Sequence, residues 1–182
     1  MATPERGPID LTALGRRIVG VAYLEGDFVL RSGRSSRYYL DKYLFATDPS
    51  VLRDIGVALA YRLPEGIHRV AGPELGAVPL ATATALASGI PSVFIRREAK
   101  GYGTAKRFEG VLEPGDRVVL VEDVVTTGGQ AIESALALQD FGAEVVRILV
   151  VIDREEGAAD AMREAGLDFE SLFTRTSLGL AT

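Results

Sequence analysis

The sequence predicts an α/β protein: a doubly wound, mostly parallel sheet flanked by helices, with a small extra lobe at the N-terminus. Short apolar runs alternate with helix-like stretches through most of the chain, and this alternation is typical of parallel sheets covered on both faces. Residues 118–121 are apolar throughout, as in a strand buried on both sides. The first forty or so residues do not show this alternation of strands and helices. We therefore expect one domain over 1–182, with the lobe at about 1–45 and the core at about 46–182.

Length and composition fit this prediction. The chain has 182 residues, enough for one domain with a sizeable core. Its 20 basic and 25 acidic residues give a net charge of −5, which argues against a nucleic-acid partner. The absence of cysteine excludes disulfides and thiolate chemistry. No export signal or membrane-spanning run is present, so we expect a cytoplasmic protein that does not bind a membrane.

The lobe is expected to begin with a helix that ends near Leu24. Asp10 or Thr12 can serve as its N-cap, because the oxygens of these side chains accept hydrogen bonds from the first helical turn. Two short strands, 28–30 and 38–40, are expected on either side of a Ser-Gly turn.

The core elements follow in order. Asp48 at an N-cap and Pro49 at the first helical position predict a helix that reaches about residue 63. An alanine-rich stretch closed by Gly89 predicts a helix over 77–88. Apolar runs and glycine boundaries predict the remaining elements. They are strands 69–71, 92–95, 118–121 and 144–152, a loop over 96–109, helices 130–141 and 158–165, and a last strand beginning at 167–169.

The most informative segment follows strand 118–121. Two carboxylates come first, then a Thr-Thr-Gly-Gly loop, then a helix. Backbone N–H groups and hydroxyls of such a loop can hold a phosphate at a helix N-terminus, and the carboxylates stand where ribose hydroxyls would bind. In this order the segment resembles the phosphoribosyl-diphosphate (PRPP) signature of the type I phosphoribosyltransferases. The alternative is an ordinary strand–turn–helix unit. The resemblance assigns these residues to PRPP: Glu122, Asp123, Val124, Val125, Thr126, Thr127, Gly128, Gly129 and Gln130.

A second segment resembles one particular family among the type I phosphoribosyltransferases. Residues 96–110 are similar to the mobile loop of the orotate phosphoribosyltransferase family, which usually reads Arg-Lys-X-X-Lys-X-His-Gly. By this resemblance Arg96, Arg97, Lys100 and Tyr102 would contact PRPP or pyrophosphate. In that family the loop reaches the neighbouring subunit, which implies a homodimer with loop 96–109 shared. The alternative for this segment is a solvated charged loop.

Two further segments resemble parts of the same family that bind the base. Residues 28–41 are similar to its N-terminal substrate segment. By this resemblance Arg31 would approach the substrate or the diphosphate, and Tyr38, Tyr39 and Leu40 would line the base. Packing within a strand is the alternative for the tyrosines. Asp153-Arg154-Glu155 is similar to the family's Asp-Arg-X-Glu, whose arginine binds the orotate carboxylate. A surface ion-pair cluster is the alternative there. Thr126 is also assigned to the orotate site.

Loop 72–76 resembles the family's second loop, which holds diphosphate through backbone amides. Some members carry a lysine near the position of Gly76, and this chain has none there.

The resemblance implies a type I phosphoribosyltransferase fold, with the lobe as its hood, and a Mg²⁺-dependent reaction of pyrimidine synthesis. PRPP and orotate would give orotidine monophosphate and pyrophosphate, with Arg96, Lys100 and Asp123 as catalytic residues. No direct protein ligand to Mg²⁺ is expected, because PRPP would carry the ion while Glu122 and Asp123 contact it through water. Two other functions stay open: a phosphoribosyltransferase for another base, and a non-catalytic PRPP-binding regulator.

Overall fold

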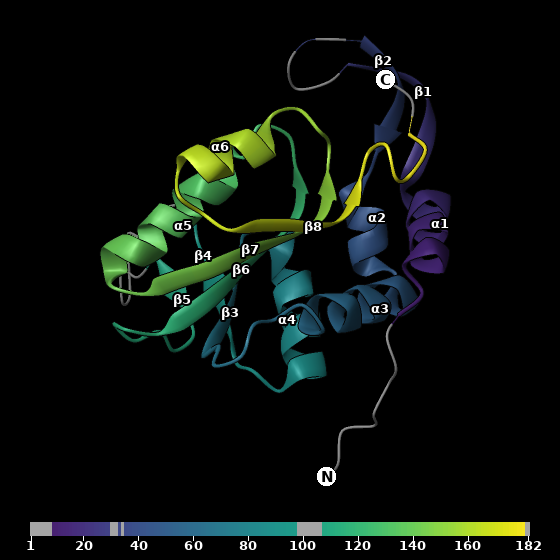
Figure 1. The fold of residues 1–182 in the computed structure, drawn as a ribbon. Helices are drawn as coiled ribbons and strands as arrows, with labels where there is room; N and C mark the ends of the chain where they lie inside the picture. The colour runs from purple at the N-terminus through teal and green to yellow at the C-terminus, as the bar shows by residue number, and fades with distance from the viewer. Residues whose placement is uncertain (1–8, 30–32, 34, 98–106, 181–182) are drawn as a thin grey trace.

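The computed structural model describes residues 9–29, 33, 35–97 and 107–180 (Figure 1). None of the helices in this part of the chain is long and apolar enough to cross a lipid bilayer.

A six-stranded sheet forms the centre of the molecule, in the order β5-β4-β3-β6-β7-β8. All neighbours pair in parallel except β4 and β5, which are antiparallel. The predicted fold class is therefore confirmed. The strands are β3 (Arg69–Pro73), β4 (Ser92–Ile95), β5 (Phe108–Glu109), β6 (Arg117–Val125), β7 (Glu144–Asp153) and β8 (Phe169–Thr174). The prediction of a loop over 96–109 was wrong at its end, since β5 returns to pair with β4.

Helices cover both faces of the sheet (Figure 1). On one face lie α1 (Leu11–Ala22), α2 (Lys42–Thr47), α3 (Pro49–Ala60) and α4 (Ala77–Ser88), and on the other lie α5 (Gly129–Phe141) and α6 (Ala158–Glu164). Each face has its own buried apolar cluster. Strand β6 serves both, because its side chains alternate: Val119 and Val121 belong to the first cluster, Val118 and Leu120 to the second.

The N-terminal lobe contains a hairpin of β1 (Tyr23–Val29) and β2 (Ser35–Leu40) in a separate two-stranded sheet. The hairpin closes onto the preceding helix, since the Asp41 N–H donates to the Ala22 carbonyl at 2.9 Å. The helix predicted to reach Leu24 therefore ends at Ala22. Helix α2 was not predicted; Asp41 caps it by accepting a hydrogen bond from the Tyr43 N–H at 3.0 Å.

Candidate active site

The sheet has a point at which its winding direction reverses. Strand β3 pairs with β4 on one side and with β6 on the other. The chain leaves β3 through α4 toward one edge, and leaves β6 through α5 toward the opposite edge. The two helices lie on opposite faces of the sheet. A cavity lined by Pro73 at the end of β3 and Gln130 of α5 opens at this end of the sheet, and we call this region the crevice. In open α/β sheets, ligands bind at this place.

Two buried carboxylates stand at this end of β6. Glu122 is 5% exposed and Asp123 is 1% exposed. Asp123 Oδ1 accepts a hydrogen bond from the Val124 N–H at 2.6 Å, and Glu122 Oε1 accepts one from the Asp123 N–H at 3.2 Å. Within the described residues, Glu122 Oε2 has no hydrogen-bond partner. Asp123 Oδ2 has no hydrogen bond either, but it makes an ionic contact at 2.9 Å with Lys42 Nζ. Glu122 Oε2 is therefore the atom available to a hydroxyl group of a ligand.

The environment of Glu122 favours its neutral form. Burial raises the pKa of this carboxyl from 4.5 to about 8, and the adjacent charge of Asp123 acts in the same direction. At neutral pH Glu122 therefore holds a proton, and in that form it can donate a hydrogen bond as well as accept one.

Lys42 at the start of α2 reaches the same place. Its Nζ lies 3.1 Å from Asp123 Oδ1 and 2.9 Å from Asp123 Oδ2. Burial by itself would lower the pKa of Lys42, but the charge of Asp123 and its hydrogen bond to Lys42 contribute most to outweighing it, and the net pKa is raised. The ammonium thus remains charged and compensates the buried Asp123.

The loop after β3 approaches these carboxylates closely. A Cβ atom placed on Gly76, the N-cap of α4, would lie 1.7 Å from Asp123 Oδ2. Any side chain at this position would collide with the carboxylate, so glycine allows the loop after β3 to approach the end of β6.

The loop after β6 has the form of a phosphate cradle. Thr126, Thr127 and Gly129 are exposed, and Gly128 adopts φ 82° as the N-cap of α5. A Cβ atom on Gly128 would also lie 3.0 Å from Met162 Cε. In the described chain no side chain caps this end of α5. Its first amide groups and the helix dipole are therefore available to an anion.

The basic loop begins beside this crevice. Arg97 donates its N–H to Glu74 Oε1 at 2.8 Å, and Arg96 Nη1 lies 3.9 Å from Glu74 Oε2. A cavity of about 380 Å³ lies here, and its lining includes Arg96, Arg97, Arg107 and Gln130. The structure thus brings the two predicted arginines to the same cavity as Gln130, although they come from different elements.

Arg154 follows β7 at the same end of the sheet. Its N–H donates to the Val125 carbonyl at 2.9 Å, which fixes its backbone next to the phosphate loop. Its Nε lies 3.2 Å from Glu156 Oε1. The contact with Glu156 is the surface ion pair that the alternative interpretation expects. The backbone of Arg154 nevertheless lies beside the crevice.

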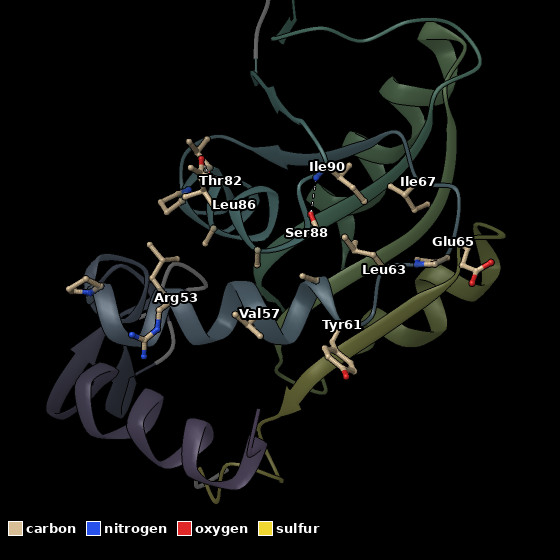
Figure 2. Close-up of a pocket in the computed structure, with 18 of the residues that line it drawn as sticks. Arg53, Val57, Tyr61, Leu63, Glu65, Ile67, Thr82, Leu86, Ser88 and Ile90 are labelled. Carbon is tan, nitrogen blue, oxygen red and sulfur yellow. Dashed lines mark hydrogen bonds between the residues drawn. The ribbon is translucent and has the colours of Figure 1, made fainter. Parts of the chain in front are cut away.

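A larger groove lies elsewhere, between α3 and α4 (Figure 2). This groove of about 1440 Å³ is lined mainly by apolar side chains such as Val57, Leu63 and Leu86. It contains none of the predicted site residues. We place the chemistry in the crevice because the buried carboxylates and the open helix N-terminus are there.

Comparison with known proteins agrees with this assignment. Residues 57–164 match the phosphoribosyl transferase domain family. An orotate phosphoribosyltransferase from Halobacterium salinarum is 49% identical over 153 residues, covering 84% of this chain and 87% of the relative. The chain belongs to the orotate phosphoribosyltransferase family. A crystal structure of the family member from Mycobacterium tuberculosis has a TM-score of 0.84 and 34% identity, covering 94% of this chain and 100% of that one. The same enzyme in complex with PRPP has a TM-score of 0.79 and 32% identity, with the same coverage.

Within this orotate phosphoribosyltransferase fold, the predicted site residues fall into three groups. The segment 122–130, Arg96, Arg97 and Arg154 lie around one end of the sheet. Tyr38 and Tyr39 lie on the hairpin, where their rings contact those of Tyr23 and Phe28 with centroids 5.4 and 5.6 Å apart. Arg31, Lys100 and Tyr102 lie outside the described residues. The individual roles of all these residues stay predictions.

Lys42 was not among the predicted site residues. The resemblance drew attention to the absence of a lysine near Gly76, and the structure brings one there from a distant part of the chain. The signal available was Asp41-Lys42 directly after the tyrosine strand, in a stretch to which no element was assigned.

Proposed function

We propose that this protein transfers the 5-phosphoribosyl group of PRPP to orotate, which yields orotidine 5′-monophosphate and pyrophosphate for pyrimidine synthesis. The observation that carries the proposal is the pairing of buried carboxylates and an open phosphate loop at the reversal point of the sheet. The named relatives and the PRPP complex of the Mycobacterium tuberculosis enzyme support the choice of substrates.

In this reaction the bond between ribose C1 and a diphosphate oxygen breaks, and its electron pair leaves with pyrophosphate. A ring nitrogen of orotate, already ionised, donates the pair that forms the new bond to C1, so no protein base is required. The positively charged ribose and the departing diphosphate are the groups that need stabilisation. Asp123, as a buried anion, would act on the ribose, and Arg96 would act on the diphosphate.

We assign the other PRPP contacts by position. Residues 124–130, with Thr126, Thr127, Gly128 and Gly129 at their centre, would hold the 5′-phosphate, and Glu122 would bind a ribose hydroxyl. Arg97, Lys100 and Tyr102 would complete the diphosphate site. Lys100→Ala should reduce turnover severely and leave the circular dichroism spectrum unchanged, since loop residues contribute little to the core. Lys106→Ala removes the same charge from the same loop and is the matched control. Unchanged turnover in Lys100→Ala would remove the loop from the mechanism.

On the base side we propose that Arg154 binds the orotate carboxylate, because a guanidinium matches a planar acid. Arg31, Thr126, Tyr38 and Tyr39 would surround the ring. Arg154→Ala should raise KM for orotate about 10- to 100-fold, since a hydrogen bond to a charged group is worth about 1.5–3 kcal/mol. Full activity of this variant on orotate would favour a phosphoribosyltransferase for another base.

The residues present fit a Mg²⁺ ion that the substrate brings with it. In the described part of the chain, no cluster of three or more acidic or histidine side chains could hold a metal. Glu122 Oε2 is buried without a hydrogen-bond partner, whereas Asp123 Oδ2 is in ionic contact with Lys42 Nζ at 2.9 Å. Glu122 Oε2 therefore suits a water molecule of a hydrated ion bound by diphosphate, and Asp123 would contact such a water beside Lys42. When bound, the ion would neutralise charge on the leaving diphosphate.

The decisive experiment follows orotate absorbance after PRPP and Mg²⁺ are added to the purified protein. A Mg²⁺-dependent decrease is the expected result. No decrease, with PRPP binding intact, would contradict the proposal and leave another base or a regulatory protein. Pyrophosphate release with any base would exclude a purely regulatory role.

We also propose a homodimer in which loop 96–109 reaches the partner's site, on the basis of the family resemblance. Sedimentation should give the mass of a dimer at working concentrations, and a monomer alone would contradict this. The protein is further proposed to act in the cytoplasm, where cell fractionation should recover its activity.

A further inference from the structure

Lys42 links the N-terminal lobe to the crevice. It is the first residue of α2, and its ammonium contacts both carboxylate oxygens of Asp123, 81 positions later in the chain. The two partners differ in exposure, since the Lys42 side chain is 38% exposed and that of Asp123 is 1% exposed. The ammonium therefore lies against a buried carboxylate, while the Lys42 side chain as a whole remains partly exposed to solvent.

The same ammonium lies beside the loop after β3. Lys42 Nζ is 3.4 Å from the position that a Cβ atom on Gly76 would occupy. The loop itself, residues 72–76, contains one glutamate and no lysine or arginine. A diphosphate held by the amides of this loop would thus find no cation within the loop, but would find Lys42 at the N-terminus of α4.

The bonding capacity of Lys42 allows it to serve two partners. An ammonium has three N–H donors. Asp123 Oδ1 accepts a hydrogen bond at 3.1 Å, and Oδ2 makes a close charge contact at 2.9 Å. At least one donor therefore remains for a phosphate oxygen. The Tyr43 ring, whose centroid lies 5.7 Å from Nζ, helps to hold the side chain in this position.

We propose that Lys42 is a binding residue of the PRPP site, with an ammonium that bridges Asp123 and the diphosphate lying against loop 72–76. The inference rests on the proposed function. It supplies the cation that loop 72–76 lacks, from an element far away in sequence. It also explains how an anionic substrate can approach a buried carboxylate, since the ammonium compensates that charge.

Pyrophosphate binding in the presence of Mg²⁺, measured by calorimetry, tests this role separately from turnover. Lys42→Met should weaken pyrophosphate binding about 10- to 100-fold, as expected for the loss of one charge-assisted hydrogen bond. KM for PRPP should rise while KM for orotate stays unchanged. Lys42→Arg should recover part of the affinity. Arg163→Met, which removes a positive charge from an exposed pair on α6, should bind like the wild type.

Lys42→Met leaves the charge of Asp123 buried and uncompensated, which could by itself disturb the fold. A second pair of variants separates this effect from the loss of a pyrophosphate contact. The double variant Lys42→Met/Asp123→Asn removes both charges and is compared with Asp123→Asn alone. A further loss of pyrophosphate affinity in the double variant is the expected result. Equal affinities would overturn the inference and reduce Lys42 to a structural partner of Asp123. If the wild type converts no orotate, the proposed function fails and the inference with it; an active wild type with equal affinities refutes Lys42 alone.

Discussion

Replacing Glu122 by Gln should change how the stability of the protein depends on pH. The folded protein holds Glu122 neutral up to about pH 8, whereas the ordinary pKa of this group is 4.5. Between these values the folded state binds a proton that the unfolded state has released. Wild-type stability contributed by this group is therefore fully present below pH 4.5 and is lost as pH rises toward 8. Glutamine, which resembles the protonated carboxyl in shape, does not titrate.

The size of the effect follows from the two pKa values. The separation from 4.5 to about 8 corresponds to at most about 5 kcal/mol. Part of this is shared with Lys42 and Asp123, so we expect Glu122→Gln to gain roughly 2–5 kcal/mol relative to wild type between pH 5 and pH 8.5. We predict how the difference in unfolding free energy between Glu122→Gln and wild type changes with pH. Any effect of altered packing is the same at every pH and does not contribute to that change.

Urea unfolding at several pH values, followed by circular dichroism because the chain has no tryptophan, measures this difference. Protein concentration is held constant, as association would otherwise contribute. Glu164→Gln, at an exposed position on α6, is the control and should give a nearly constant difference from wild type. If the difference in unfolding free energy between Glu122→Gln and wild type also stays constant with pH, the reasoning is refuted. Glu122 would then have the same pKa in the folded and unfolded states.

Two glycines give sharper structural tests. Gly76→Ala places a methyl group 1.7 Å from Asp123 Oδ2, and it should reduce kcat/KM for orotate transfer about 100-fold or more, as expected when reacting groups are displaced by about 1 Å. Gly20→Ala, where a Cβ meets nothing within 4 Å, is the control and should keep the wild-type kcat/KM. Equal kcat/KM values for the two variants would show that the loop after β3 is not tightly coupled to Asp123. Gly128→Ala forces a left-handed alanine against Met162 and should lower the unfolding free energy by about 1–2 kcal/mol while raising KM for PRPP. Wild-type values of both quantities would contradict the account of the phosphate loop.

The chemically central part of the site could be predicted because it is contiguous. In residues 118–130 the strand, carboxylates, phosphate loop and helix start follow one another, and each has its own local signal. Chain connectivity alone then places Glu122 and Asp123 next to the loop. The parallel sheet was predictable for a similar reason, since the alternation of apolar runs and helical stretches is a local pattern.

Features set by contacts between distant residues could not be predicted. The bond between Lys42 and Asp123 depends on how the lobe docks onto the sheet, and no local signal encodes that. Strand β5 has only two residues and exists because it pairs with β4. Helix α1 ends at Ala22 and not near Leu24, because Tyr23 already pairs with Leu40 in the hairpin and Asp41 N–H donates to the Ala22 carbonyl.

The packing of α1 has a consequence for how this protein is made. Gly15 of α1 lies so close to Phe173 of β8 and to Leu178 that a Cβ atom there would be 3.1 Å from each. The helix and the C-terminal strand lie near each other in Figure 1, and they share one buried cluster. In the chain α1 precedes β8, with the other helices and strands between them. Helices α2 and α3 can pack against α1 early in synthesis, but the contact around Gly15 can form only after β8 has been made, so this part of the core closes after the elements between them.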